Sequence, residues 1–317
     1  MNKKRDIVSE ISETKARHRY GYSVSELFDR IEKLEQAFHS APKENNELLK
    51  YFPVSLVACM EGYFKLAIKE LIDSGEPFLS NAEKEFADTK INLAIFKAIH
   101  GKKITFGEFI SHTLSFSSLE EINKKLSALT NIDFLEKVKT VHNRFDVEVR
   151  QLTKVSIIKD SDRTISNTRK LFEIRHIICH ELATEFEITN SDIEEQFKDC
   201  LTFLKASEEL LTNILYPGRP LTQIDMNKEA ERQMIESQEI IDDLMREAQK
   251  IIDKKNFQRL SANQKLWDDF SHSWADLNSN NHKDGSIFTS SRNGLLTEMA
   301  NFRAKQILKY LKSYSSQ

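Results

Sequence analysis

The segment KLFEIRHIICHELATEF carries the residue types in this chain that are best suited to chemistry. Arg175, His176 and His180 lie within six positions of one another. A helix turns by about 100° per residue, so His176 and His180 share a face and Arg175 stands about 140° from His180. Arginine can hold a phosphate through a bidentate fork, and histidine can act as general base or acid near neutral pH. Together these side chains could form a minimal ribonuclease centre.

Residue types alone also leave two other interpretations open. In a structural interpretation, the histidines are satisfied inside a helical bundle and Arg175 pairs with Glu173, Glu181 or another acid. In a metal interpretation, His176 and His180 form a two-ligand clamp for zinc. The segment is not an H-E-x-x-H motif, however, and it places no third ligand. We therefore expect no metal and no cofactor.

The elements that must position this segment are helices. The chain has 317 residues but only 8 glycines and 5 prolines, against a background of roughly 7% and 5%. Sheet proteins need many of these turn residues. A hydrophobic content of 39% and a charged content of 30% fit helical bundles with long solvated faces. We predict an all-α fold of two or three domains.

The overall charge argues against one class of function. A net charge of −3 is not that of a strongly basic nucleic-acid coat, so RNA binding must rest on a local patch. Lys102, Lys103 and Arg169 are candidates for such a patch, beside the alternative that they are ordinary solvated surface. Three further arginines are candidates of the same kind: Arg144, Arg150 and Arg163.

The cysteines and the apolar runs indicate a location. The three cysteines form no C-x-x-C pair, which favours reduced, structural thiols. The basic start MNKKR is not followed by the apolar run of a signal peptide. No stretch approaches the roughly 18 apolar residues of a membrane span. We expect a cytoplasmic protein without a membrane partner.

Two helices are predicted before residue 80. The first covers residues 23–41, with Ser23 as a candidate N-cap. The second is the most hydrophobic of the chain and covers residues 53–75, with Pro53 in its first turn and Gly75 at or just past its end. Glu61 lies inside that apolar run. It is either a surface or paired acid, or an acid that faces a polar site in the bundle.

Residues 80–165 predict several shorter helices. We expect a turn at Thr105–Gly107, an N-cap at Ser117 or Ser118, and one amphipathic helix over residues 134–154. The segment KDSDRTISN indicates a polar break.

The helix with the two histidines follows that break and is predicted from about Ile165 to Glu187. Its apolar stripe has helical spacing and comprises Leu171, Ile174, Ile178 and Leu182. Ser191 and Glu194 then form a capping-box pattern for the next helix.

The segment YPGRPL marks the expected domain boundary, because two prolines flank a glycine between long helical patterns. We predict an N-terminal helical extension over residues 1–44, a bundle over residues 45–215 and a small helical domain over residues 218–317. A packing seam in the last domain comprises Met234, Ser237, Ile241, Leu244, Ala248 and Ile251. We expect Trp267 and Trp274 to be core residues.

The sequence IRHIICHE resembles the signature of the HEPN superfamily, which is Arg, a polar residue, a few mostly apolar residues and His on a late helix of a four-helix bundle. Arg175, His176 and His180 occupy those positions. The apolar helix with Glu61 resembles the first long helix of that bundle. KITFGEFISHTLSFSSLEEINKKLSAL is similar to the intervening region of the HEPN subfamily associated with RiboL and PSP domains. The resemblance spans residues 45–215.

This resemblance implies a mechanism and a partner. Members with an intact motif are commonly RNA endonucleases that dimerise, so that two copies of the motif face each other. His180 would deprotonate the ribose 2′-hydroxyl or protonate the leaving 5′-oxygen, and Arg175 would stabilise the charge on the phosphorane. His176 would orient the motif or contact phosphate. An isologous two-fold interface of the bundle would supply the second copy.

The C-terminal segments TQIDMN, NQKLWDDF, DGSIFTSS and LLTEMANFRAKQILKYL resemble the lysozyme-inhibitor LprI-like domain. Family versions usually read Gln-x-x-Trp followed by an Arg-Asp pair and cysteines. Gln264 and Trp267 match, while Asp268 and Asp269 replace the basic element and the cysteines are absent. The resemblance implies a small helical domain that binds or senses a partner.

From these patterns we expect a metal-independent RNA endonuclease of HEPN type, with RNA as substrate and a role as a toxin or in antiviral defence. An antitoxin or another protein would then be its partner. Two alternatives stay open. One is a catalytically silent HEPN module for dimerisation or nucleotide binding, and the other is an enzyme inhibitor that acts through the LprI-like domain.

Overall fold

The structure, a computed structural model, describes residues 6–17, 24–181, 184–280, 283 and 285–315. Every regular element in these ranges is a helix, which confirms the predicted all-α fold. The elements in chain order are α1 (Ile7–Ala16), α2 (Val24–Ser40), α3 (Asn46–Asp73), α4 (Phe78–Glu85), α5 (Leu93–His100), α6 (Phe106–Thr113), α7 (Leu119–Thr130), α8 (Phe134–Thr140), the π-helix η1 (Phe145–Val149), α9 (Ser161–His180), α10 (Asn190–Leu215), α11 (Gln223–Ile251), α12 (Lys254–Ser279) and α13 (Phe288–Ser315). Among the described helices, none is both long and apolar enough to cross a membrane.

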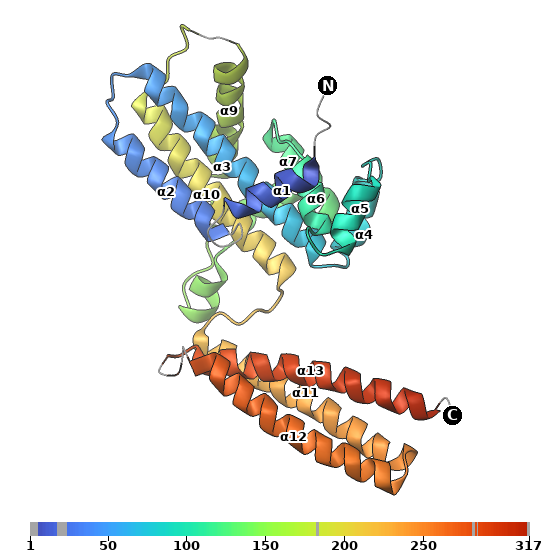
Figure 1. Cartoon of the computed structure of the whole chain (residues 1–317). Coiled ribbons are helices and arrows are strands. Elements are labelled where there is room, and N and C mark those ends of the chain that lie inside the picture. The colour runs from blue at the N-terminus through green and yellow to red at the C-terminus, as the bar shows by residue number, and fades with distance from the viewer. Residues whose placement is uncertain (1–5, 18–23, 182–183, 281–282, 284, 316–317) are drawn as a thin grey trace. The chain divides into compact units, whose positions relative to one another are not determined.

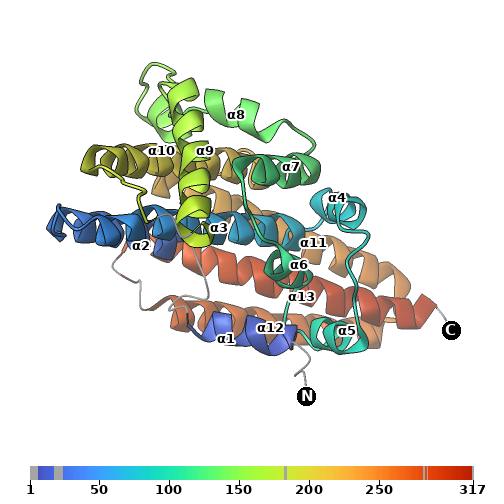
Figure 2. The same cartoon turned by 90° about the horizontal axis from the view of Figure 1, so that it is seen from above.

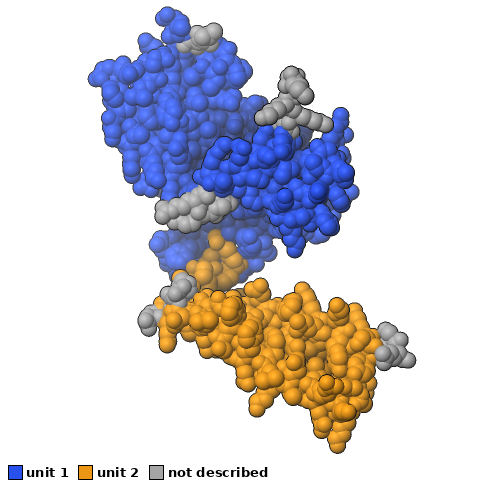
Figure 3. All heavy atoms as spheres, in the orientation of Figure 1, with its two compact units in different colours: residues 1–218 blue, residues 219–317 orange. Residues whose placement is uncertain are grey.

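The helices fall into two compact units, residues 1–218 and residues 219–317, drawn in different colours in Figure 3. The chain passes from one unit to the other within the segment YPGRPL. Gly218 has a φ of +74° there, in the left-handed region that glycine adopts at little cost.

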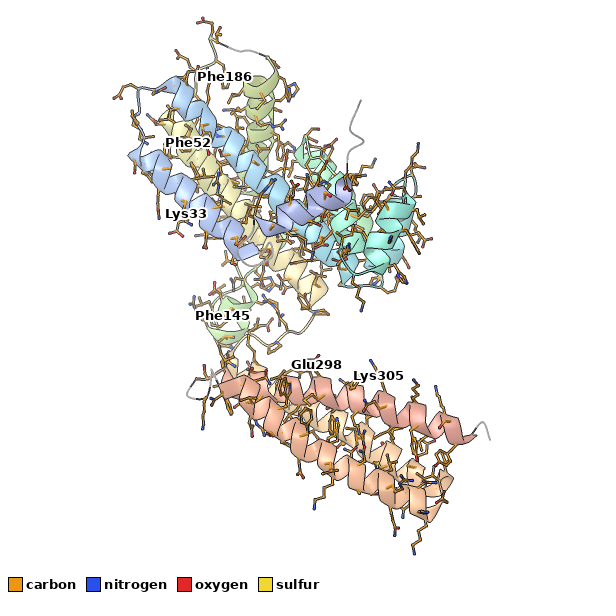
Figure 4. The ribbon with its side chains drawn as sticks, in the orientation of Figure 1. Lys33, Phe52, Phe145, Phe186, Glu298 and Lys305 are labelled. Atoms are coloured by element: carbon orange, nitrogen blue, oxygen red, sulfur yellow. The ribbon has the colours of Figure 1, made fainter. Side chains whose placement is uncertain are left out.

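The long helix α3 is the centre of the first unit. It packs against α2, α9 and α10, and its C-terminal half contacts α4 and α6 (Figures 1 and 2). Phe38 of α2, Phe52 of α3 and Phe197 of α10 contact one another with ring centroids 5.3 to 6.2 Å apart. Figure 4 labels Phe52 among these helices. Burial of these rings fixes the position of α3, and therefore of any functional side chain that it carries.

The structure corrects the start of α3 and confirms its end. The helix begins at Asn46, after an N-cap at Asn45, so Pro53 lies in the helix interior and not in the first turn. An interior proline lacks a backbone donor and clashes with the preceding turn, at about 3 kcal/mol. The burial of neighbours such as Phe52 offsets that cost. Gly75 follows the helix with a φ of +91°, as expected for a residue just past a helix end.

The predicted turn at Thr105–Gly107 is wrong, because helix α6 starts there. Thr105 is its N-cap and forms a capping box with Glu108. Gly107 lies in the first turn of the helix, and a Cβ atom there would be 2.5 Å from the backbone oxygen of Lys69. This glycine therefore allows α6 to approach α3 closely. The predicted cap at Ser118 is confirmed.

The single amphipathic helix predicted over residues 134–154 is also wrong. Helix α8 ends at Thr140, and Val141 has an extended backbone. His142 then forms an isolated antiparallel bridge with Ser156, before the chain turns into η1. A pairing partner fourteen residues away therefore overrides the local helical pattern.

Helix α9 starts and ends earlier than predicted, at Ser161–His180 instead of residues 165–187. Asp160 is its N-cap, and its carboxylate accepts a hydrogen bond from the backbone N–H of Arg163 at 3.0 Å. The polar residues that indicated a break therefore form the first turn. Glu181 is the C-cap.

Helix α10 starts with a capping box two residues before the predicted one. Thr189 and Asp192 form it, in place of Ser191 and Glu194. Ile188, the residue before this cap, is buried, and so is Ile193 at the start of α10. Such an apolar pair across the cap fixes where a helix begins.

The second unit contains α11, α12 and α13. Ile241 and Ala248 of α11 are buried against Ala300, Ala304 and Ile307 of α13, and the alanines let the two helices approach closely. Figure 4 labels Glu298 and Lys305, two exposed residues of α13. The unit therefore buries a narrow apolar seam and exposes charged side chains.

Two predictions for this unit need correction. The seam ends at Ile252 and not at Ile251, which is 42% exposed, because the backbone becomes extended at residue 252. Trp267 packs against the core as predicted. Trp274 does not, since it is 44% exposed and stacks on the exposed ring of Phe270, with 6.2 Å between centroids.

Candidate functional site

A buried polar network fixes α9 against α10. Asp199 of α10 is only 2% exposed. Its carboxylate accepts hydrogen bonds from Arg163 Nη2 at 3.1 Å, Thr164 Oγ1 at 3.0 Å and Asn167 Nδ2 at 2.6 Å. Sequence reasoning missed Asp199, because its partners lie more than thirty positions away and share no local motif with it. The network sets the rotation of α9 about its own axis.

The predicted apolar stripe of α9 faces the core within the described residues. Leu171 and Ile174 are buried, and Ile178 is partly buried against the same cluster. Leu182, the fourth residue of the stripe, and Ser23, the candidate cap of α2, lie outside the described residues. Because the apolar side of α9 is occupied by packing, its polar residues are left at the surface.

Arg175, His176 and His180 meet at the C-terminal end of α9. Nη1 of Arg175 lies 3.4 Å from Nε2 of His180, and the imidazole centroids of His176 and His180 are 5.1 Å apart. Nη2 of Arg175 is 4.0 Å from Oε1 of Glu61 on α3. Both histidines are exposed, and the arginine side chain is 32% exposed. The structure thus brings four sequence-selected residues together on one surface.

Glu61 lies in an environment that disfavours its charge. Burial raises the pKa of this carboxyl, and the positive charges of Arg175 and Lys65 only partly oppose the rise. The side chain is 24% exposed. The guanidinium of Arg175, 4.0 Å away, is a nearby cation that this carboxylate can orient.

A groove of about 450 Å³ lies between the N-terminal part of α3 and the end of α9. Tyr51 and Val54 line it from α3, and Ile178 and Cys179 line it from α9. Tyr51 is 48% exposed. Sequence reasoning missed this tyrosine, although an aromatic residue at the polar border of an apolar helix was a signal for it. An exposed ring beside basic groups can stack on a nucleobase.

The backbone beyond α9 is tied to α3 at this end of the unit. Nδ2 of Asn46 donates to the carbonyl oxygen of Phe186 at 3.0 Å, and Oδ1 of Asn46 accepts from the backbone N–H of Ile188 at 3.2 Å. Figure 4 labels Phe186 in the segment that leaves α9. This double contact holds the chain beside the groove.

The predicted basic patch is not gathered at this site. Arg169 pairs with Glu120 of α7, with 2.5 Å between Nε and Oε1. Lys102 and Lys103 lie between α5 and α6, helices that pack on α1 and α3. The three further arginines are each paired with an acid: Arg144 with Glu148, Arg150 with Asp146 and Arg163 with Asp199. The four arginines proposed for the RNA-binding patch are therefore each paired with an acid within the chain.

Among the described residues, no group of three or more His, Cys, Asp and Glu side chains is arranged to hold a metal ion. His176 and His180 lie as a pair, and Arg175 contacts His180. The imidazoles of this surface can transfer protons, and the guanidinium can bind an anion.

A family model for the RiboL-PSP-HEPN domain matches residues 22–213. This match starts just before α2, ends within α10 and includes the helices that carry Glu61 and Arg175. The searches of curated proteins and of solved structures found no match.

Proposed function

The chain belongs to the RiboL-PSP-HEPN family, and from that premise we propose that it is an RNA endonuclease that works without a metal ion. The observation that carries the proposal is the 3.4 Å approach of Arg175 to His180 on an exposed helix end. Because this helix end is exposed, a substrate can reach the guanidinium and the imidazole together.

RNA supplies its own nucleophile in this reaction. His180 accepts the proton of a ribose 2′-hydroxyl, the 2′-oxygen attacks phosphorus, and the bond from phosphorus to the 5′-oxygen breaks. The leaving 5′-oxygen takes up a proton, so the products are a 2′,3′-cyclic phosphate and a 5′-hydroxyl. Arg175 stabilises the charge on the phosphorane. When the phosphate binds the guanidinium of Arg175 in place of His180, Nε2 of His180 becomes free to accept the proton.

The second acid or base comes from a second copy of the chain in this proposal. The two histidines of one copy lie on the same helix face, 5.1 Å apart, so they approach a phosphate from one side only. A two-fold axis beside the end of α9 would place another Arg175–His180 pair on the other side. Sedimentation of the full chain as a monomer at assay concentrations would contradict this part of the proposal.

The groove lined by Tyr51 and Cys179 is the proposed seat of one nucleotide. The ring of Tyr51 offers a stacking surface for a base, and stacking of this kind contributes about 1–3 kcal/mol per base. Lys50 and Glu47 border the same groove and form an ion pair at 2.6 Å. The groove therefore adds a base-sized contact to the charge-based contact at Arg175.

Cleavage of total RNA and of tRNA in EDTA tests the assignment. His180→Ala should lose about 100-fold or more of the cleavage rate, the usual contribution of a general acid or base. His100→Ala is the matched control, since it removes an exposed histidine from α5. Mapping of the cleaved ends should find 2′,3′-cyclic phosphates. Equal activity in His180→Ala would leave a silent dimerisation or nucleotide-binding module as the better description.

A role as a toxin or defence effector, held in check by an antitoxin or another protein, follows only from analogy with other members of the superfamily. Its test is expression of the chain in a bacterial host. Growth arrest that Arg175→Ala and His180→Ala both abolish would support this role, and unimpaired growth with the unmodified chain would count against it.

Enzyme inhibition by residues 218–317 is the second candidate function. The observation that favours it is the exposed, stacked pair of Phe270 and Trp274 on α12, because aromatic residues dominate protein interfaces. Lysozyme activity in the presence of the full chain tests it. Inhibition that is lost in a Phe270→Ala, Trp274→Ala variant would support this function, and undiminished lysozyme activity would refute it.

A further inference from the structure

The second unit contains a buried arginine whose hydrogen-bond partners are neutral. Arg303 of α13 is only 8% exposed. Its Nε donates to Oε1 of Gln264 at 2.9 Å, its Nη2 to Oδ1 of Asn263 at 2.7 Å and its Nη1 to Oε1 of Gln306 at 3.3 Å. All three acceptors are amide oxygens, so none of them cancels the charge of the guanidinium.

Asp268 is connected to Arg303 indirectly, through the side chain of Gln264. Gln264 donates to Oδ1 of Asp268 at 2.8 Å while it accepts from Arg303. Burial lowers the pKa of Arg303, and Asp268 only partly opposes that effect. In the described part of the chain, no ion pair is found for Arg303 or for the neighbouring Arg259. A buried cation without a paired anion is costly in a folded protein.

This guanidinium forms part of the wall of a cavity of about 250 Å³ between α12 and α13. The polar lining comes from Arg259 and Asn263 on α12, and from Arg303, Gln306 and Tyr310 on α13. Two apolar side chains complete the wall, and none of the described residues that line it is an acid. Two positive charges therefore share one small cavity.

The amides around this cavity are left with donors. The side-chain oxygens of Asn263 and Gln306 already accept hydrogen bonds from Arg303. Their NH₂ groups therefore remain as potential hydrogen-bond donors. The two guanidinium groups have further N–H donors, while the hydroxyl of Tyr310 shares a hydrogen bond with that of Tyr314 at 3.2 Å. The lining thus offers positive charge and hydrogen-bond donors from two helices, a combination that suits an oxygen-rich anion.

We propose that this cavity binds a phosphate group, either as free phosphate or as the head of a small phosphate monoester. A planar carboxylate is satisfied by a single arginine fork. Donors that converge from both α12 and α13 fit the four oxygens of a tetrahedral anion better. The bound anion joins the two helices and so stabilises the second unit. The proposal does not depend on RNA cleavage by the first unit.

Isothermal titration calorimetry of the full chain tests the site. An Arg175→Ala background prevents phosphate binding at α9 from contributing heat. Inorganic phosphate, glycerol 3-phosphate and acetate are titrated separately at one ionic strength held with chloride. We expect saturable heat with the two phosphates and none with acetate. Tighter binding of glycerol 3-phosphate than of inorganic phosphate would identify a monoester as the occupant, and the reverse order would identify free phosphate.

Arg259→Gln is the decisive variant, because Arg259 is exposed and its loss leaves the buried contacts of Arg303 in place. It should weaken phosphate binding about tenfold or more, the effect of one lost charge-assisted contact. Arg246→Gln is the matched control, an exposed arginine of α11 paired with Asp243. Absence of saturable heat, equal binding of acetate, or equal affinity in the Arg259 and Arg246 variants would each overturn the proposal.

Discussion

Glu61→Gln should stabilise the protein slightly and impair the reaction that we propose. Glutamine keeps the size of the side chain and removes its charge. Burial raises the pKa of the Glu61 carboxyl in spite of Arg175 and Lys65, so the folded chain binds the proton more tightly than the unfolded chain. The ionised carboxylate is therefore a net cost to folding at neutral pH.

The sign of the pH dependence follows from the raised pKa. The stability of the unmodified protein falls as pH rises from the ordinary glutamate pKa to the raised value in the folded state. Glu61→Gln does not titrate, so its advantage should be absent at pH 4 or below, grow through that window and then stay constant. The side chain is 24% exposed and its arginine contact is 4.0 Å long. Partial exposure screens the cost of this charge, and loss of the weak pair with Arg175 offsets part of the relief, so the gain should stay below about 1 kcal/mol.

The same substitution should slow RNA cleavage about tenfold, which corresponds to about 1.4 kcal/mol in the barrier. Without the carboxylate, the guanidinium of Arg175 is no longer oriented from the α3 side. The loss should appear in kcat with little change in KM, because Glu61 acts through Arg175 and does not contact the RNA itself.

Thermal unfolding at pH 4 and pH 7.5, together with cleavage rates in EDTA, measures both effects. Glu70→Gln is a matched control on the same helix, since burial also raises the pKa of Glu70 while Lys69 opposes the rise. It should gain stability in the same way and keep full activity. A loss of more than 1 kcal/mol at pH 7.5 in Glu61→Gln, or unchanged cleavage, would refute the reasoning.

Three further predictions concern packing and the groove. Phe52→Ala should lower the free energy of unfolding of the first unit by about 3–5 kcal/mol, because its ring is 2% exposed; a loss under 1 kcal/mol in urea titration would be incompatible with a central α3. Gly107→Ala should lower the free energy of unfolding by about 1–3 kcal/mol, since the new Cβ would lie 2.5 Å from the Lys69 backbone oxygen. Gly294→Ala is the control, because the space for a Cβ is open there, and it should be neutral or stabilising in the same titration. Tyr51→Ala should raise the KM for RNA roughly tenfold by loss of stacking, and Tyr51→Phe should not; equal KM values for the two variants would remove the groove from the substrate path.

Helical content and the packing faces could be predicted from the sequence because they depend on composition and on short spacings. Few glycines and prolines indicated an all-α fold, and the stripe through Leu171 and Ile174 identified the buried side of α9. Helix ends were less predictable, because two capping boxes competed at the start of α10. The buried Ile188 beside Thr189 decided between them, and burial is a property of the tertiary structure.

The chemical residues of the site were also visible in the sequence, since Arg175, His176 and His180 are close neighbours on one helix. Their distances to Glu61 depend on how α9 packs on α3 and were open until the fold was known. The groove beside Tyr51 and the contacts of Asp199 depend on long-range packing in the same way.

The sequence by itself determined which side chains could do chemistry and which helix carried them, because these properties need no contact beyond one or two turns. The tertiary structure alone decided that Arg175 meets Glu61, that Arg163 and Arg169 are partnered by acids of other helices, and that Arg303 is buried among amides. Each of these depends on the relative position of groups on different helices or distant turns. That position is set by core packing, which no local spacing encodes.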